Sequence, residues 1–133
     1  MDQVELAAQY VQAWGEHSPE AIVALHSEDT VFHLHGNVPA AAGREAVREM
    51  IAGLFSHVPD LRFEARRMYF GNDHMVFEYV MAGTADGAPF ECDGVDVISV
   101  REGLVVRKDT YLDLATYQQQ AGALPGSSRT NRV

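Results

Sequence analysis

Apolar residues recur at two different periods along this chain. Over its first part they return every three to four positions, which predicts amphipathic helices at residues 2–15, 19–25 and 43–57. A short alternating segment between the second and third helices predicts a strand at residues 30–35. From residue 61 the period is two, which predicts four long strands and a final helical turn or two, at residues 61–70, 75–84, 89–100, 104–112 and 113–120.

Capping and turn residues agree with these limits. Asp2 and Ser18 stand at the expected N-caps of the first two helices, and Pro19 occupies the first helical position of the second. Turn sequences separate the long strands, at Asp86-Gly87 and Arg101-Glu102-Gly103 among others. Helices followed by a meander of strands predict an α+β fold, in which a curved antiparallel sheet wraps over the helices and encloses a cone-shaped cavity.

The length of 133 residues suits one domain, expected at residues 1–121, with a flexible tail at 122–133 that is rich in polar residues, Gly, Pro and Ser. The net charge of −9 and the scattered basic residues argue against a nucleic-acid or anionic-membrane partner. The first residues do not resemble a signal peptide and no apolar run would span a membrane, so a cytoplasmic location is expected. Cys92 is the single cysteine, which excludes an intrachain disulfide and a thiolate metal site.

Asp96 is the first candidate for chemistry. Strand alternation places it on the same face as Phe90, Cys92, Ile98 and Val100, which are all apolar. A carboxyl group on such a face either turns to solvent at a strand end or is held in protonated form in a pocket, where it donates a hydrogen bond. In the second case Asp96 would stabilise a developing enolate.

His33 and His35 are candidate general bases, because a neutral imidazole can take a proton from the carbon beside a carbonyl group. They share one face of the short strand, and Phe32 and Leu34 share the other. If Phe32 and Leu34 are the core pair, both histidines turn away from the cavity. Two histidines at this spacing also suit a metal, but the sequence indicates no third and fourth ligand, so no metal site is predicted.

The remaining candidates line the expected cavity. Tyr10, on the apolar face of the first helix, would donate a hydrogen bond into it. Glu78 is a substitute base if its strand turns Val76 and Val80 inward, and a solvated residue if the larger apolar set faces inward instead. The residues expected to contact a ligand are Trp14, Leu34, Met50, Leu54, Phe77, Cys92 and Thr110.

The order of these elements resembles the nuclear transport factor 2-like superfamily, in particular its ketosteroid isomerase and SnoaL-like polyketide cyclase branch. Three local matches carry the resemblance: Tyr10-Val11 with the Ala21 to Leu25 run, the Gly43-Arg44-Glu45-Ala46-Val47 segment, and the final hairpin ending in Tyr111-Leu112-Asp113. The resemblance implies a cone-shaped α+β barrel, no cofactor, a small hydrophobic ligand, and a homodimer through the outer sheet face, to which Val95, Val97 and Tyr111 would contribute.

Residue by residue, the ketosteroid isomerase resemblance implies an oxyanion hole made by Tyr10 and Asp96. That family's general base is a carboxylate. Its position falls on Leu34, or on His33 with a one-residue deletion, so this chain lacks the carboxylate that moves the proton in that family. The chain also resembles limonene-epoxide hydrolase. The catalytic positions of that enzyme are occupied here by uncharged residues, which excludes its chemistry. These residues are Ala82, Val80, Thr110, Phe32 and Leu34.

Two hypotheses therefore stand. In the first, the chain is a cofactor-free isomerase or cyclase for a small hydrophobic carbonyl compound, with His33 or His35 as the base and Tyr10 and Asp96 holding the enolate oxygen. In the second, the same fold is a non-catalytic ligand-binding or dimerisation module.

Overall fold

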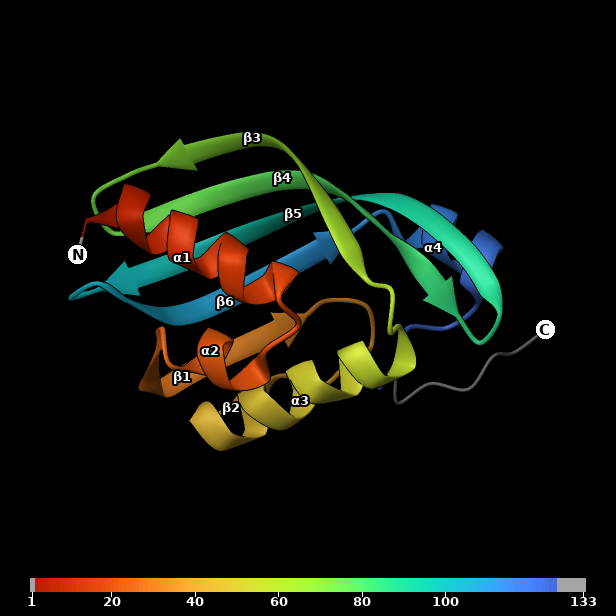
Figure 1. Ribbon diagram of the computed structural model, residues 1–133, viewed down its shortest axis with the longest axis horizontal. Coiled ribbons are helices and arrows are strands. Elements are labelled where there is room, and N and C mark those ends of the chain that lie inside the picture. The colour runs from red at the N-terminus through yellow and green to blue at the C-terminus, as the bar shows by residue number, and fades with distance from the viewer. Residues whose placement is uncertain (1, 127–133) are drawn as a thin grey trace.

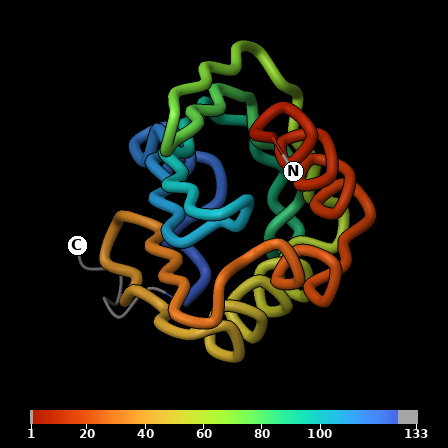
Figure 2. The backbone as a smooth tube through the Cα atoms, turned by 90° about the vertical axis from the view of Figure 1, so that its left-hand side faces the viewer, coloured from red at the N-terminus to blue at the C-terminus, as the bar shows by residue number. Residues whose placement is uncertain are grey.

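The computed structural model describes residues 2–126 of the chain. Its elements are, in order, α1 (Gln3–Gly15), α2 (Pro19–Val23), β1 (His26–Leu34), β2 (Ala41–Ala42), α3 (Arg44–His57), β3 (Arg62–Phe70), β4 (His74–Ala85), β5 (Ala88–Arg101), β6 (Leu104–Leu112) and α4 (Leu114–Ala121). Within these residues the strands form one curved sheet in the order β2-β1-β6-β5-β4-β3. Helix α1 crosses the concave side of the sheet, and α2 and α3 lie beside β1 (Figure 1). Seen from the end, sheet and helices surround a common interior (Figure 2).

The helix starts follow from side chains that satisfy free backbone N–H groups. The Asp2 carboxylate accepts a hydrogen bond from the Glu5 N–H at 2.8 Å, and the Ser18 hydroxyl oxygen accepts one from the Ala21 N–H at 3.1 Å. Both predicted caps are confirmed. The second helix is shorter than predicted, because the chain turns at Ala24 and Leu25 and enters β1 at His26, four residues before the predicted strand.

Two-residue turns join β4, β5 and β6. Asp86-Gly87 connects β4 to β5 and Glu102-Gly103 connects β5 to β6, and all four residues have positive φ, between 50° and 80°. This is the turn geometry that matches the right-handed twist of a hairpin, and glycine adopts it without steric cost. The predicted meander from β3 to β6 is confirmed.

The sheet is mixed, which corrects the expectation of a purely antiparallel one. Strand β1 pairs with β6 in parallel, with His33 opposite Asp109 and Leu34 opposite Thr110. The two strands are separated in sequence by α3 and four other strands, so no local turn fixes their relative direction. The short strand β2, which was not predicted, pairs with β1 at the sheet edge.

The core lies between the concave side of the sheet and the helices. On β5 the residues that share a face with Asp96 are buried as predicted: Phe90, Cys92, Ile98 and Val100. The predicted tail at 122–133 overlaps the described residues only at 122–126, where the Leu124 side chain packs into the core; its remaining residues lie outside the described part of the chain. No helix within residues 2–126 is both long and apolar enough to cross a membrane.

Gly94 on β5 permits a close side-chain approach that shapes the interior. A Cβ atom at this position would lie 2.7 Å from Tyr79 Cε1 and 2.8 Å from Leu112 Cδ2. We expect Gly94→Ala to lower the free energy of unfolding by about 1–3 kcal/mol, as overpacking does, measured by urea denaturation. The matched control is Gly53→Ala in α3, where nothing lies within 4 Å; it should raise stability by up to about 1 kcal/mol. Equal stability of Gly94→Ala and the wild type would contradict this account.

Candidate functional site

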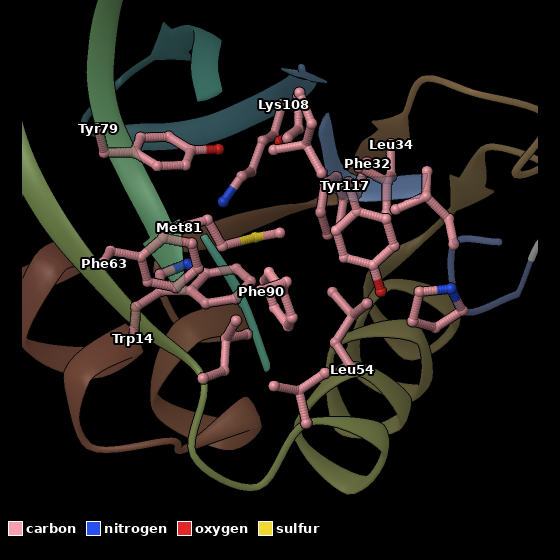
Figure 3. Close-up of a pocket in the computed structure, with 16 residues that line it drawn as sticks. Trp14, Phe32, Leu34, Leu54, Phe63, Tyr79, Met81, Phe90, Lys108 and Tyr117 are labelled. Carbon is pink, nitrogen blue, oxygen red and sulfur yellow. The ribbon is translucent and has the colours of Figure 1, made fainter. Parts of the chain in front are cut away.

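An apolar-walled space lies between α1 and the concave side of β3 to β6. We call it the main cavity; its volume is about 230 Å³, and its wall includes Tyr10, Trp14, Phe63, Met68, Phe77, Tyr79, Asp96 and Lys108. A smaller pocket of about 40 Å³ adjoins it on the side of α3 and α4 and shares Trp14, Phe63, Tyr79 and Lys108 with it. Figure 3 shows this smaller pocket, with Tyr79 and Lys108 directed toward the same part of the interior.

Asp96 lies at the wall of the main cavity with 5% of its surface exposed. Its Oδ1 accepts hydrogen bonds from the Tyr79 hydroxyl at 2.8 Å and from the Thr110 hydroxyl at 2.7 Å. Its Oδ2 lies 3.4 Å from Lys108 Nζ. Every partner of this carboxyl group is therefore a donor or a cation, so Asp96 serves as an acceptor, and its predicted role as a hydrogen-bond donor does not fit these contacts.

Lys108 supplies the positive charge of the site. It is the only lysine of the chain, and it too is 5% exposed. Its Nζ lies 3.9 Å from the centre of the Trp14 ring, and the rings of Tyr10 and Phe32 are slightly farther away. An ammonium group over an indole face gains cation–π attraction, which is larger when water is excluded. Asp96 and Lys108 thus form a buried ion pair against an aromatic wall.

Tyr79 fixes the carboxylate from the neighbouring strand. Burial, joined by the negative charge of Asp96, raises the pKa of the Tyr79 phenol well above its ordinary value of 10.0. The phenol therefore keeps its proton at neutral pH and donates it to Asp96 in a hydrogen bond.

Tyr10 takes part in a second buried chain of polar groups. Its hydroxyl lies 2.9 Å from His26 Nε2, and His26 Nδ1 lies 2.8 Å from the Thr30 hydroxyl oxygen. Burial, with smaller contributions from the charges of Lys108 and Arg44, lowers the pKa of His26 to about 3. His26 is therefore neutral near pH 7, and its tautomer decides whether the Tyr10 hydroxyl donates to it or accepts from it.

The predicted histidine bases do not face the cavity. Phe32 and Leu34 point into the core, so His33 and His35 lie on the outer face of the sheet. His35 stacks on Tyr111 with 4.1 Å between ring centres and pairs with Asp109. Their position excludes proton transfer to a molecule in the main cavity, because the sheet separates the two.

The other predicted residues divide between the two spaces and the core. Trp14 and Phe77 line the main cavity, and Leu34, Leu54 and Thr110 line the smaller pocket. Met50 and Cys92 line neither and belong to the packed interior. Burial raises the pKa of the Cys92 thiol to about 11, so it is not a thiolate at neutral pH. Glu78 lies at the cavity rim with its carboxylate paired to Arg67.

Sequence reasoning missed Lys108, Tyr79 and the half-exposed Phe63 at the cavity mouth. Lys108 carried a usable signal, because alternation along β6 places it on the same face as Thr110. A lone lysine at an inward position of a strand is a departure from binary patterning.

The geometry defines a class of protein: a cone-shaped α+β fold of the nuclear transport factor 2-like type, with a small cavity under the first helix. The model of the SnoaL-like domain family matches residues 7–108, so the chain belongs to that family.

Solved structures agree with this assignment. A hypothetical protein with a ketosteroid isomerase-like fold from Catenulispora acidiphila, in complex with trimethylamine, is 22% identical with a TM-score of 0.81, covering 90% of this chain and 94% of that one. A putative SnoaL-like polyketide cyclase from Jannaschia sp. is 19% identical with a TM-score of 0.78, covering 92% of each chain. TerC, co-crystallised with polyporic acid, is 15% identical with a TM-score of 0.77, covering 88% and 95%. At these identities the structures show the fold alone. No curated protein matches the sequence.

The neutral state of His26 predicts a pH dependence of stability. The pKa of His26 is 6.5 in the unfolded chain and about 3 in the folded chain. At a pH between these values, His26 binds a proton in the unfolded chain and not in the folded chain. Stability should therefore fall as the pH drops below 6.5, with His26 contributing about 1.4 kcal/mol per pH unit. His26→Gln should have a shallower dependence in urea unfolding measured at about pH 7 and about pH 5. Parallel losses in both proteins over this range would contradict the assignment.

Proposed function

We propose that this chain is a cofactor-free proton-transfer catalyst, an isomerase or cyclase, for a small hydrophobic carbonyl compound bound in the main cavity. The observation that carries the proposal is the buried Asp96–Lys108 ion pair at the wall of an aromatic cavity. A buried ion pair contributes little net stability compared with apolar residues of similar volume. Its presence beside a ligand-sized space therefore favours a role in function.

The contacts suggest a division of labour between the two charges. Tyr79 and Thr110 occupy Oδ1 of Asp96, so Oδ2 is the oxygen that takes a proton from the carbon beside the carbonyl group. The negative charge that develops on the carbonyl oxygen then meets the Lys108 ammonium, in surroundings where electrostatic attraction is stronger than in water. Asp96 takes the role predicted for a histidine, and Lys108 takes the role predicted for Asp96.

Two outcomes are possible for the enolate, and neither requires a cofactor. If Asp96 returns its proton to a different carbon of the same molecule, the double bond moves and the product is an isomer. If the enolate carbon attacks a second carbonyl of the same molecule, a ring closes and the new alkoxide takes the proton. Tyr10 also lines this cavity. When His26 carries its hydrogen on Nε2, it donates to the Tyr10 hydroxyl oxygen, and the Tyr10 proton is free. Tyr10 is then a second hydrogen-bond donor to the enolate oxygen.

The cavity limits the size of the substrate. Its volume of about 230 Å³ corresponds to roughly eight water molecules at ~30 Å³ each. That space suits a molecule of one or two rings. The indole N–H of Trp14 is buried without a hydrogen-bond partner within residues 2–126, which favours a ligand with an additional acceptor.

The alternative is a non-catalytic module that binds a small ligand in the same cavity. The outward position of His33 and His35 favours it, because neither histidine can act as a base on a molecule in the cavity. The two functions differ in one measurable respect: only a catalyst accelerates exchange of the ligand's acidic protons.

The test is proton–deuterium exchange of small cyclic enones and β-diketones in D₂O, followed by NMR. We expect the wild type to accelerate exchange, Asp96→Asn to lower the rate by about 100- to 10,000-fold, and Lys108→Met to lower it by about 100- to 1,000-fold. The matched control is Asp93→Asn, an exposed carboxylate on the same strand, which should retain the wild-type rate.

Misfolding is separated from loss of function by the double variant Asp96→Leu with Lys108→Met. Because it removes both charges together and leaves no buried charge unpaired, it should fold as the wild type does, by circular dichroism, and yet be inactive. Ligand binding without accelerated exchange by the wild type would support the binding module. Full activity of Asp96→Asn would exclude Asp96 as the base.

We also propose a homodimer through the outer face of β5 and β6. Val97 is 40% exposed and Tyr111 is 45% exposed on adjacent strands, with Val95 directly opposite Tyr111. Apolar side chains exposed together are typical of surfaces that pair.

Light scattering coupled to size-exclusion chromatography tests the dimer. The wild type should elute with twice the mass of one chain, and Val97→Asp should convert it to a monomer, because a carboxylate would be buried unpaired at the interface. The control is Val4→Asp, at an exposed valine on α1, which should remain dimeric. A wild type that is monomeric at all concentrations would refute the dimer.

A further inference from the structure

The outer face of the sheet carries a cluster that the main cavity does not use. His33 projects from β1 and His35 follows directly after its last residue, with 3.7 Å between the two ring centres. Asp109 projects from β6 and stands opposite His33 in the parallel register. One donor atom from each of these three residues lies within 4.8 Å of the other two. The sequence alone indicated the two histidines, and the parallel pairing of β1 with β6 adds the carboxylate.

The geometry points to a binding site for a divalent late first-row transition metal ion, with Zn²⁺ as the physiological candidate, held by His33, His35 and Asp109. Two imidazole nitrogens and one carboxylate oxygen suit zinc, and a set of three protein ligands leaves a position for water or another molecule. Hard ions such as Mg²⁺ prefer oxygen ligands alone and should bind here poorly. This proposal differs from the sequence-based prediction that the chain has no metal site.

The backbone and its neighbours hold the three ligands close to binding geometry. Strands β1 and β6 are hydrogen-bonded through this region up to the His35 N–H, which donates to the Thr110 carbonyl at 3.0 Å. Tyr111 stacks on His35, and the His35 Nε2 already lies 2.9 Å from Asp109 Oδ1. Donor atoms around one zinc ion lie about 3.4 Å apart for bonds of ~2.0–2.1 Å. The cluster therefore needs a side-chain adjustment of about an ångström and no change of fold.

Arg107 is the competing group. Its Nε donates to Asp109 Oδ2 at 2.8 Å and its Nη2 donates to Asp109 Oδ1 at 3.0 Å. A metal on Oδ1 displaces the second bond and keeps the first, which leaves the carboxylate hydrogen-bonded from behind, as metal-ligating carboxylates usually are. The guanidinium charge also weakens attraction for a cation, so the site should release its metal readily to chelators.

Isothermal titration of the metal-free full chain with Zn²⁺ tests the site, with Mg²⁺ as the comparison ion. We expect saturable binding of one zinc per chain, and at least about tenfold weaker binding in His33→Ala, His35→Ala and Asp109→Asn, since even the outer partners of metal ligands change affinity about 10–100-fold. His74→Ala is the matched control, because His74 is an exposed histidine that also pairs with an aspartate. It should bind as the wild type does.

Thermal unfolding gives a second readout that separates binding from misfolding. Zinc should raise the unfolding midpoint of the wild type and of His74→Ala, and raise that of His33→Ala clearly less at the same concentration, because stabilisation follows the affinity for the folded state. Among residues 2–126 the His33 ring stacks only with His35, so His33→Ala should fold normally without metal. The proposal is overturned if zinc in large excess gives no saturable binding, if His33→Ala binds as tightly as the wild type, or if Mg²⁺ binds equally well.

Discussion

Two opposite charges, Asp96 and Lys108, are buried together against aromatic rings, and the surrounding structure has to compensate for their removal from water. That removal costs several kcal/mol per ion, and attraction between the two recovers it only when other hydrogen bonds are in place. Tyr79 and Thr110 supply those bonds to the carboxylate, and the Trp14 ring faces the ammonium. The absence of a side chain at Gly94 lets the Tyr79 ring lie across β5 where its hydroxyl reaches Asp96.

Much of this arrangement could be predicted from the sequence, because it depends on local rules. Alternation along β5 placed Asp96 on the apolar face, and the same rule gave the correct orientation of Phe32 and Leu34 as the core pair of β1. The helix caps and hairpin turns follow from single residues and their immediate neighbours.

What could not be predicted depends on how the strands pair. The contacts of Asp96 follow from the exact register of the β5–β6 hairpin, which places Thr110 opposite Asp96 and Lys108 two residues away on the same face. The direction of β1 relative to β6 is equally non-local, and it alone brings Asp109 beside His33. The buried His26 lies between the predicted second helix and the predicted strand, because β1 begins four residues before its alternating pattern does.

Strand β6 shows how one segment can serve two unrelated sites. Its inward residues, Lys108 and Thr110, complete the charge cluster of the cavity, and its outward residues, Arg107 and Asp109, belong to the histidine cluster on the opposite face. In the ketosteroid isomerase pattern that the sequence resembles, the base position falls on β1, where this chain has the buried Leu34. The buried charged residues of this chain, Asp96 and Lys108, lie instead on β5 and β6. Because His26 is held neutral, Lys108 is the buried cation at the cavity wall, and in the proposed mechanism it is the group that would face the developing oxyanion.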